Sequence, residues 1–291
     1  MDELTIGLVG TGLLIALVFS GVRVVYSCAA IGLLGLVSIV GWEGGAGNAG
    51  MIPYAKGTIY ALSVLPMFIL IGFLAYHAGM TEKLFDAARK WVGWVPGGLA
   101  VATVFATAGF AAVSGASTAT AAVFSRVAIP EMLKYGYSPR LAAGVVAAGG
   151  TLGILIPPSI VLIIYAVMVE ANVATLFQAA FIPGILAALG YIAVIAIVVR
   201  VNPEAGPAGP KASRAEKWSA LLEVWPVLLI FVLVMGGIYF GFFTPTEGAG
   251  VGAFGTFLIA VTRGGMRFQG FVEALLGTAQ TTAMIFLILL G

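Results

Sequence analysis

The stretch AAVSGASTATAAVF, residues 111–124, decides how this sequence folds. It consists mainly of small residues, and four of its side chains carry hydroxyl groups: Ser114, Ser117, Thr118 and Thr120. Small residues let helices pack closely, and a serine or threonine within a helix can bond the preceding turn. The same oxygens can instead be held toward a ligand. The rest of the sequence must distinguish close packing from a binding site.

The composition is that of a membrane protein. Hydrophobic residues make up 61% of the 291 residues and charged residues only 9%, against about 25% in soluble domains. Several apolar runs approach the roughly 20 residues that a helix needs to cross a bilayer, and none alternates like a barrel strand. We therefore expect an all-α integral membrane protein. The net charge of +2 gives no reason to expect a nucleic-acid partner, and the single cysteine excludes an internal disulfide.

The apolar runs divide the chain into segments. We expect scaffold spans within 4–79, an interfacial helix at 81–94, a hairpin at 95–139, a broken span at 141–170 and a span at 174–199. Within the scaffold, residues 42–58 form a Gly-rich stretch that is too polar and broken to span. After a hydrophilic cytoplasmic linker at 201–217, we expect spans at 219–241 and 244–262 and another that begins near 273.

The basic residues orient these segments. By the positive-inside rule, the cytoplasmic side should hold Arg23, the cluster Lys83–Lys90, the loop 200–217, Arg263 and Arg267. This is possible only if the segment 95–139 enters and leaves the membrane on the same side, as a re-entrant hairpin with its tip at Ser114–Ser117. Arg126, about 13 Å along a helix from Ser117, would then reach the cytoplasmic interface. A full crossing at 97–115 would instead leave Arg126 deep in lipid or protein.

The stretch GGTLGILIPPSIVLIIY, residues 149–165, predicts a helix that breaks within the membrane. Neither Pro157 nor Pro158 has a backbone N–H, and Pro158 disfavours helical geometry at Pro157. Carbonyl groups near Gly153–Ile156 therefore lose their helical partners. Such groups cost several kcal/mol each in a bilayer unless protein, water or an ion binds them.

The order of segments indicates two inverted repeats. Residues 1–200 form the first repeat, residues 201–217 link the two, and residues 218–291 open the same unit in the opposite orientation. Inverted repeats with discontinuous helices are typical of secondary transporters. Because the sequence stops inside an apolar run, MIFLILLG, we expect the second repeat to be incomplete.

The hairpin tip and the broken helix supply the same kind of ligand. Ser114 and Ser117 are three residues apart and can face one point, and the break offers carbonyl groups near Gly153, Ile156 and Pro157. These are neutral oxygens, which suit a hard monovalent cation such as Na⁺. Tight packing of Gly and Ser between helices remains the alternative at this stage.

Four stretches resemble a known family. They are SGASTATAAVFSRVAIPEMLKYGYSPRLAAGVVAAGGTLGILIPPSIVLIIYAV at 114–167, LFQAAFIPG at 176–184, FFTPTEGAGVGAFG at 242–255 and TAQTTAMIFLILLG at 278–291. Together they resemble the large permease subunit of tripartite ATP-independent periplasmic (TRAP) transporters. The sequence departs from the family where Gly21-Val22-Arg23 replaces the common Gly-Val-Pro, and family members are longer.

The resemblance implies an elevator-type carrier that imports an organic acid together with Na⁺, for example a C4-dicarboxylate, sialic acid or a similar carboxylate. It implies two protein partners, a small four-helix membrane subunit and a periplasmic substrate-binding protein, in the inner membrane of a bacterium or archaeon. Carried over by motif, the Na⁺ site falls on Ser114, Ser117, Gly153, Ile156 and Pro157. We expect the substrate to lie near Gly115, Thr118, Pro158 and Ser159. No other cofactor is implied.

Two alternatives remain at this stage. A stand-alone Na⁺-coupled dicarboxylate or citrate-type carrier would share the hairpin but would need no binding protein. A channel or a purely structural membrane scaffold is the second alternative; a channel is disfavoured because the polar groups cluster at two breaks and do not line a continuous path. An enzyme is not expected, because Ser114 and Ser117 have no basic partner nearby in sequence.

Overall fold

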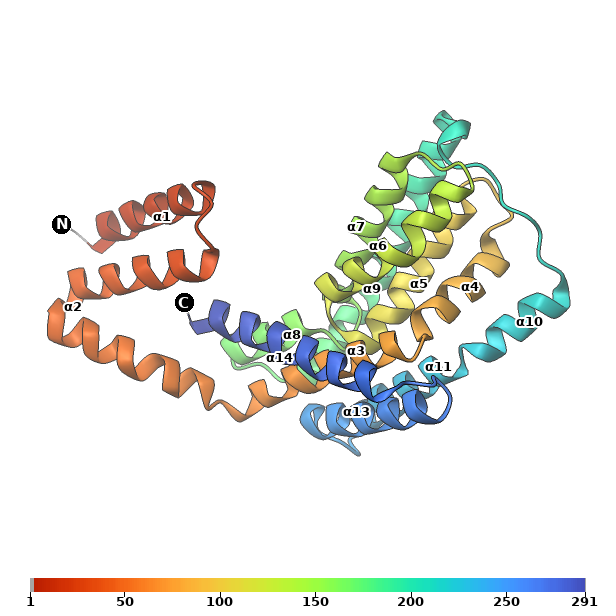
Figure 1. Cartoon of the computed structure of the whole chain (residues 1–291). Helices are drawn as coiled ribbons and strands as arrows, with labels where there is room; N and C mark the ends of the chain where they lie inside the picture. The colour runs from red at the N-terminus through yellow and green to blue at the C-terminus, as the bar shows by residue number, and fades with distance from the viewer. Residues whose placement is uncertain (1–2, 291) are drawn as a thin grey trace. The chain divides into compact units, whose positions relative to one another are not determined.

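The computed structural model describes residues 3–290, and every regular element in that range is helical. Residues 1, 2 and 291, which belong to the two expected repeats, lie outside this range. The chain divides into two compact units, one made of residues up to 63 together with those from 279 onward, and one made of residues 64–278. Figure 1 shows the helices by label and colour. The candidate site lies entirely in the second unit.

The first unit begins with two helices that pack on each other, α1 (Glu3–Phe19) and α2 (Val24–Gly57). α2 is bent at Gly41, whose φ of 79° and ψ of 173° are not helical. The expectation of a broken Gly-rich stretch at 42–58 is wrong in part, because residues 42–57 continue as a helix. Only Gly41 leaves the helical conformation, and the other glycines lower helix propensity without abolishing it. A short 3₁₀ turn, Tyr60–Ser63, follows.

The second unit is a bundle of helices. Its elements are α3 (Val64–His77), α4 (Met80–Val92), α5 (Gly98–Ser114), α6 (Ser117–Lys134), α7 (Pro139–Leu155), α8 (Ile160–Met168), α9 (Val173–Val201), the 3₁₀ turn Pro203–Ala205, α10 (Arg214–Glu223), α11 (Trp225–Phe231), a π-turn at Val232–Gly236, α12 (Gly237–Tyr239) and α13 (Pro245–Thr262). α14 (Phe268–Leu290) contributes to both units.

α5 lies at the centre of the second unit and contacts α3, α4, α6, α7 and α9 (Figure 1). Most of its side chains are small, and Leu99 and Phe110 are 1% exposed, whereas Phe105 faces outward and is 50% exposed. The ring of Phe110 packs edge-on against Phe124 of α6, with 5.9 Å between ring centroids. Close contact with so many neighbours follows from the alanines of α5, which let helix backbones approach.

The apolar helices identify a multi-pass membrane protein. Within residues 3–290, four helices are long and apolar enough to cross a membrane, and the number rises to six if two bent helix pairs each count as one span. One bent pair is α7 with α8, and the other joins α10 to the segment Trp225–Tyr239; each bends by 42°.

The expected span at 219–241 begins later than the hydropathy indicated. α10 ends at Glu223, and a separate helix starts at Trp225. Pro226 explains the bend, because it cannot donate a hydrogen bond to the preceding turn. α10 also starts inside the expected linker, where Ser213 and Glu216 form a capping box. Residues 214–223 therefore form a separate polar-faced helix before the span.

Candidate functional site

The turn between α5 and α6 holds the four residues SGAS. α5 ends at Ser114, and Gly115 caps it with a φ of 63° and an N–H that donates to the carbonyl of Ala111 at 2.9 Å. Ala116 is extended, and α6 starts at Ser117. Glycine adopts this left-handed conformation without steric cost, which lets the chain reverse in two residues. The small residues of the motif therefore produce a tight helical hairpin.

The hydroxyl groups of this turn differ in surroundings. Ser114 is fully buried, with its Oγ 3.4 Å from Oγ1 of Thr120. Thr120 Oγ1 donates to the carbonyl of Ala116 at 2.7 Å, so this hydroxyl stabilises the start of α6. Ser117 is half-buried, and Thr118 is exposed. As the first residue of α6, Ser117 has no preceding helical turn to bond, which leaves its hydroxyl free to serve a ligand.

The helix break lies where the two prolines predict it. α7 ends at Leu155, and α8 begins at Ile160. Ser159, only 1% exposed, caps α8 by accepting from the N–H of Leu162 at 3.4 Å. Its Oγ also donates to the carbonyl of Ile154 at 2.8 Å. The carbonyl of Ile154 is thus satisfied by protein, whereas that of Gly153 loses its helical donor because Pro157 has no N–H.

The hairpin tip and the helix break touch. The N–H of Ile160 donates to the carbonyl of Gly115 at 3.0 Å. A Cβ on Gly115 would lie 2.8 Å from the carbonyl oxygen of Pro158, and a Cβ on Gly153 would lie 2.9 Å from the backbone nitrogen of Ser117. Only glycine fits at these positions without displacement. The structure therefore brings the two polar stretches of the sequence into one place.

The expected site residues take different positions in this contact. The tip meets the break through Gly115, Ser117, Gly153, Pro158 and Ser159. Ile156 is half-buried and its side chain turns toward α9, because a Cβ on Gly184 would lie 3.1 Å from Ile156 Cγ1. Pro157 is buried, and its peptide bond to Pro158 is cis.

Sequence reasoning missed two further contacts. Gly72 of α3 packs directly on Ser114, since a Cβ there would lie 2.8 Å from Ser114 Cβ. Gly150 of α7 packs on Ala121 of α6, since a Cβ on Gly150 would lie 2.8 Å from Ala121 Cβ. Gly150 stands within the proline-containing stretch 149–165, but Gly72 lies in an apolar run that carries no polar signal.

The charge at this site comes from helix ends. α5 and α7 end here, and α6 and α8 begin here. At the start of α8, the N–H groups of Ile160 and Leu162 are already bonded within the protein. C-terminal ends carry partial negative charge and N-terminal ends partial positive charge. Within the described range, no three His, Cys, Asp or Glu side chains come close enough to hold a metal ion. The chemistry available is that of neutral oxygens and backbone dipoles.

A second polar region lies at the opposite end of the hairpin. There the linker packs back on the bundle: Gly97 N–H donates to Gly206 O at 2.8 Å, and Gly209 N–H to Gly93 O at 2.9 Å. The N–H of Ser138 donates to Ala205 O at 3.0 Å. The linker is therefore bonded both where the hairpin segment begins, at Gly97, and where it ends, at Ser138.

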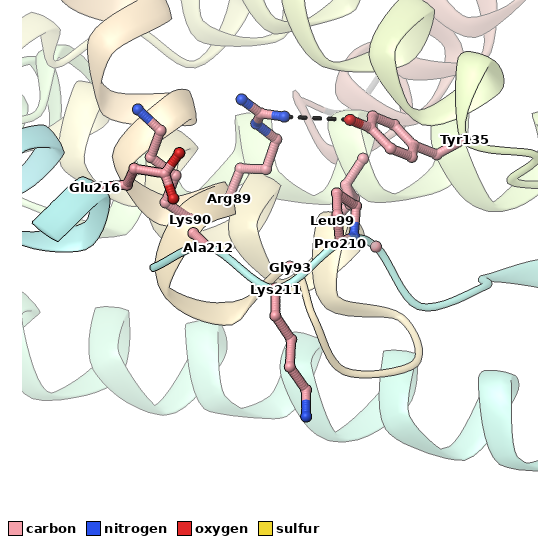
Figure 2. Close-up of a pocket in the computed structure, with 10 residues that line it drawn as sticks. Arg89, Lys90, Gly93, Leu99, Tyr135, Pro210, Lys211, Ala212 and Glu216 are labelled. Carbon is pink, nitrogen blue, oxygen red and sulfur yellow. Dashed lines mark hydrogen bonds between the residues drawn. The ribbon is translucent and has the colours of Figure 1, made fainter. Parts of the chain in front are cut away.

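Linker and α4 enclose a pocket of about 180 Å³. Figure 2 shows Arg89 and Tyr135 pointing toward one another, while the side chain of Lys211 extends away from them. Arg89 Nη1 donates to the Tyr135 hydroxyl at 3.3 Å. Asp86 binds both Arg89 and Lys90 at 2.6 Å. Partial burial raises the pKa of the Asp86 carboxyl, but the hydrogen bonds from Arg89 and Lys90 outweigh it and hold that pKa below its ordinary value. Arg89 and Lys90 are therefore paired within α4, whereas Lys211 of the linker lies over the ring of Trp94, 5.4 Å from its centroid.

Comparison with known proteins gives a consistent match. A family model described as the DctM component of the tripartite ATP-independent periplasmic transporter matches residues 11–291. The C4-dicarboxylate TRAP transporter large permease protein DctM of Pseudomonas aeruginosa is 42% identical over 233 residues, which cover 79% of this chain and 54% of that protein. The match confirms the resemblance that the sequence motifs indicated.

Other relatives carry different substrate names. The sialic acid TRAP transporter large permease protein SiaM of Vibrio cholerae is 35% identical over 80% of this chain and 54% of its own length. The isethionate TRAP transporter permease protein DctMQ of Oleidesulfovibrio alaskensis is 32% identical over 79% of this chain and 36% of its own length. The chain spans about half the length of the first two relatives.

Proposed function

Because the chain belongs to the family of TRAP transporter DctM components, we propose that it forms part of the membrane carrier of a Na⁺-coupled importer of organic acids. The observation that carries the proposal is the contact between hairpin tip and helix break. Two stretches of the sequence, each interrupted by a turn, meet where the N–H of Ile160 donates to the carbonyl of Gly115, 45 residues earlier, at 3.0 Å.

The Na⁺ site in this proposal uses the ends of α5 and α7. Its ligands are oxygens of Ser114, Ser117, Gly153, Ile156 and Pro157, the hydroxyl and carbonyl groups that a hard monovalent cation prefers. The partial negative charge at the ends of α5 and α7 favours a cation further. No carboxylate is needed, which suits an ion that must be released on the other side of the membrane.

The substrate carboxylate in this proposal binds beside the Na⁺ ion, at the starts of α6 and α8. Gly115, Thr118, Pro158 and Ser159 surround these two N-termini, whose partial positive charge favours an anion. A cation and an anion held side by side raise each other's affinity, and linkage makes this effect equal in both directions. Reciprocal binding of this kind would couple substrate uptake to the Na⁺ gradient.

The same proposal extends to the whole permease. Residues 95–139 form a re-entrant hairpin, and residues 1–200 and 218–291 belong to two inverted repeats of an elevator-type carrier. A small four-helix membrane subunit and a periplasmic binding protein complete the importer in the inner membrane of a bacterium or archaeon. Support comes from the family match and from relatives named for C4-dicarboxylate, sialic acid and isethionate, all organic acids.

Transport by reconstituted protein tests the proposal. The full-length permease, its small subunit and its binding protein are placed in liposomes, and uptake of labelled organic acids is measured with and without a Na⁺ gradient. We expect Na⁺-dependent uptake that the double variant Ser114→Ala/Ser117→Ala reduces at least about tenfold, equivalent to about 1.4 kcal/mol. We also expect this variant to need a higher Na⁺ concentration for half-maximal uptake.

Ser125→Ala is the matched control, since Ser125 lies on α6 outside the site and donates to Ala122 O at 2.7 Å. Its uptake should equal that of the wild type. Equal Na⁺ dependence in all three proteins would assign SGAS to packing alone. Uptake without the binding protein would favour the stand-alone carrier.

A further inference from the structure

A groove of about 420 Å³ runs along the outside of the bundle between α7 and α9, with α5 as its floor. Its α7 wall includes Arg140, Gly144 and Ala148, and its α9 wall includes Tyr191 and Val198. None of these residues belongs to the candidate ion and substrate site. A ligand in this groove would require only a membrane around the chain, so its binding is independent of the transport proposal.

The groove is long, narrow and apolar. Arg140 and Ala148 are eight residues apart on α7, which corresponds to a length of about 12 Å. Its floor, Val104 of α5, is 1% exposed, whereas Val198 at the rim is 37% exposed. At Gly144 the groove is open, because a Cβ there would meet no atom within 4 Å.

Only one end of the groove offers a free charge. Arg140 is exposed, and it forms no ion pair with any residue in the range 3–290. It is the second residue of α7, at the end of the bundle where Ser138 binds the linker residue Ala205. At the other end, the Tyr191 hydroxyl lies 2.7 Å from Thr151 Oγ1 and is already bonded. An occupant should therefore be anionic at the Arg140 end and apolar along the rest.

The groove is large enough for a single alkyl chain but too small for a helix. A helix segment 12 Å long and about 10 Å across would fill roughly 940 Å³, more than the 790 Å³ of space between the walls of the groove, open solvent included. A single alkyl chain is both narrow and apolar. Because the chain leaves the apolar bilayer for an apolar groove, its fit comes from van der Waals packing against Val104 and the walls.

We propose that this groove binds an anionic glycerophospholipid, with one acyl chain between α7 and α9 and the phosphate on Arg140. Basic residues beside membrane helices on the cytoplasmic side are the usual contact for anionic headgroups. Linker and Arg140 lie at the same end of the bundle, the end that the positive-inside rule assigns to the cytoplasm. The lipid would fill the outer surface of α7 and steady the helix that carries Gly153.

Native mass spectrometry of the purified full-length permease tests this proposal, with phosphatidylglycerol compared with phosphatidylcholine of the same chains. We expect phosphatidylglycerol to bind at least about fivefold more tightly to the wild type. Arg140→Gln should abolish that preference, and Gly144→Leu, which fills the open part of the groove, should weaken binding of both lipids. Gly190→Leu is the matched control, since Gly190 of α9 is equally open but lies outside the groove.

A phosphatidylglycerol with a photoreactive group on its acyl chain gives an independent readout, because cross-linked peptides identify the site directly. We expect labels on residues 144–148 and 191–198. Size-exclusion profiles and unfolding temperatures like those of the wild type show that the variants are folded. Equal lipid binding in all variants, or labels elsewhere on the protein, would overturn the proposal, as would a cross-link from Gly144→Cys to another protein subunit.

Discussion

Gly153 lies where α7 meets the hairpin tip, and it shows that backbone contact shapes this site as much as the hydroxyl groups do. A Cβ at this position would lie 2.9 Å from the nitrogen and 3.0 Å from the Cα of Ser117. Both atoms belong to the backbone at the start of α6, so they cannot rotate away as a flexible side chain could. Any larger residue must separate the two elements.

Replacing Gly153 and Gly144 by alanine should therefore have opposite effects. Gly153→Ala should lower the free energy of unfolding by about 1–3 kcal/mol through overpacking. Gly144→Ala, on the same helix but with open space at its Cβ, should raise it by up to about 1 kcal/mol through helix propensity. Thermal unfolding of the detergent-solubilised permease measures both. Equal unfolding temperatures for the two variants would mean that tip and break are not in contact.

The sequence predicts the turn and the helix break better than it predicts the contacts between them. Two prolines and the glycine of the SGAS motif have local consequences, so the break after Leu155 and the turn at Gly115 followed from residue type alone. The direction of Ile156 toward α9 and the packing of Gly72 on Ser114 depend on how distant segments meet. No local pattern encodes such contacts.

At the scale of elements, hydropathy locates the apolar segments and misplaces some helix boundaries. Residues 42–57 are helical although rich in glycine, because only Gly41 departs from helical geometry. Hydropathy divides α10 between the linker and the following span because the run 219–241 is apolar on average. A capping box at Ser213 and a proline at 226 are the local signals that separate it.

The linker gives a prediction at this scale. A Cβ on Gly209 would lie 2.8 Å from the carbonyl of Gly93, so Gly209→Val should detach the linker from the bundle. We expect trypsin to cleave the permease at Lys211 or Arg214 several times faster in this variant, as measured by gel electrophoresis and peptide mass. Ala208→Val is the control, because Ala208 is exposed and the added methyl groups should not disturb docking. Unchanged cleavage in Gly209→Val would mean that these contacts do not hold the linker.

For the whole molecule, the low charge content and the apolar runs are enough to predict a helical membrane protein, and the helices of the structure agree. Its orientation in the membrane, in contrast, was assigned by the positive-inside rule alone, from a few arginines and lysines in the loops. Trp94 directly precedes the hairpin segment, and Lys134 is the last residue of α6. The sides of the membrane on which these two residues lie therefore decide between a re-entrant hairpin and a full crossing.

Single cysteines introduced after Cys28 is replaced should reveal that choice in intact cells and inverted vesicles. Trp94→Cys, Lys134→Cys and the linker variant Ala208→Cys should react with a membrane-impermeant maleimide from the cytoplasmic side, since all three residues are exposed. Ala171→Cys, in the exposed turn between α8 and α9, should react only from the outside, because the broken span separates it from the linker. Labelling of Trp94→Cys and Lys134→Cys from opposite sides would make the segment 95–139 a full crossing. Such a result would also reverse the orientation assigned to every later segment of the chain, including the second repeat.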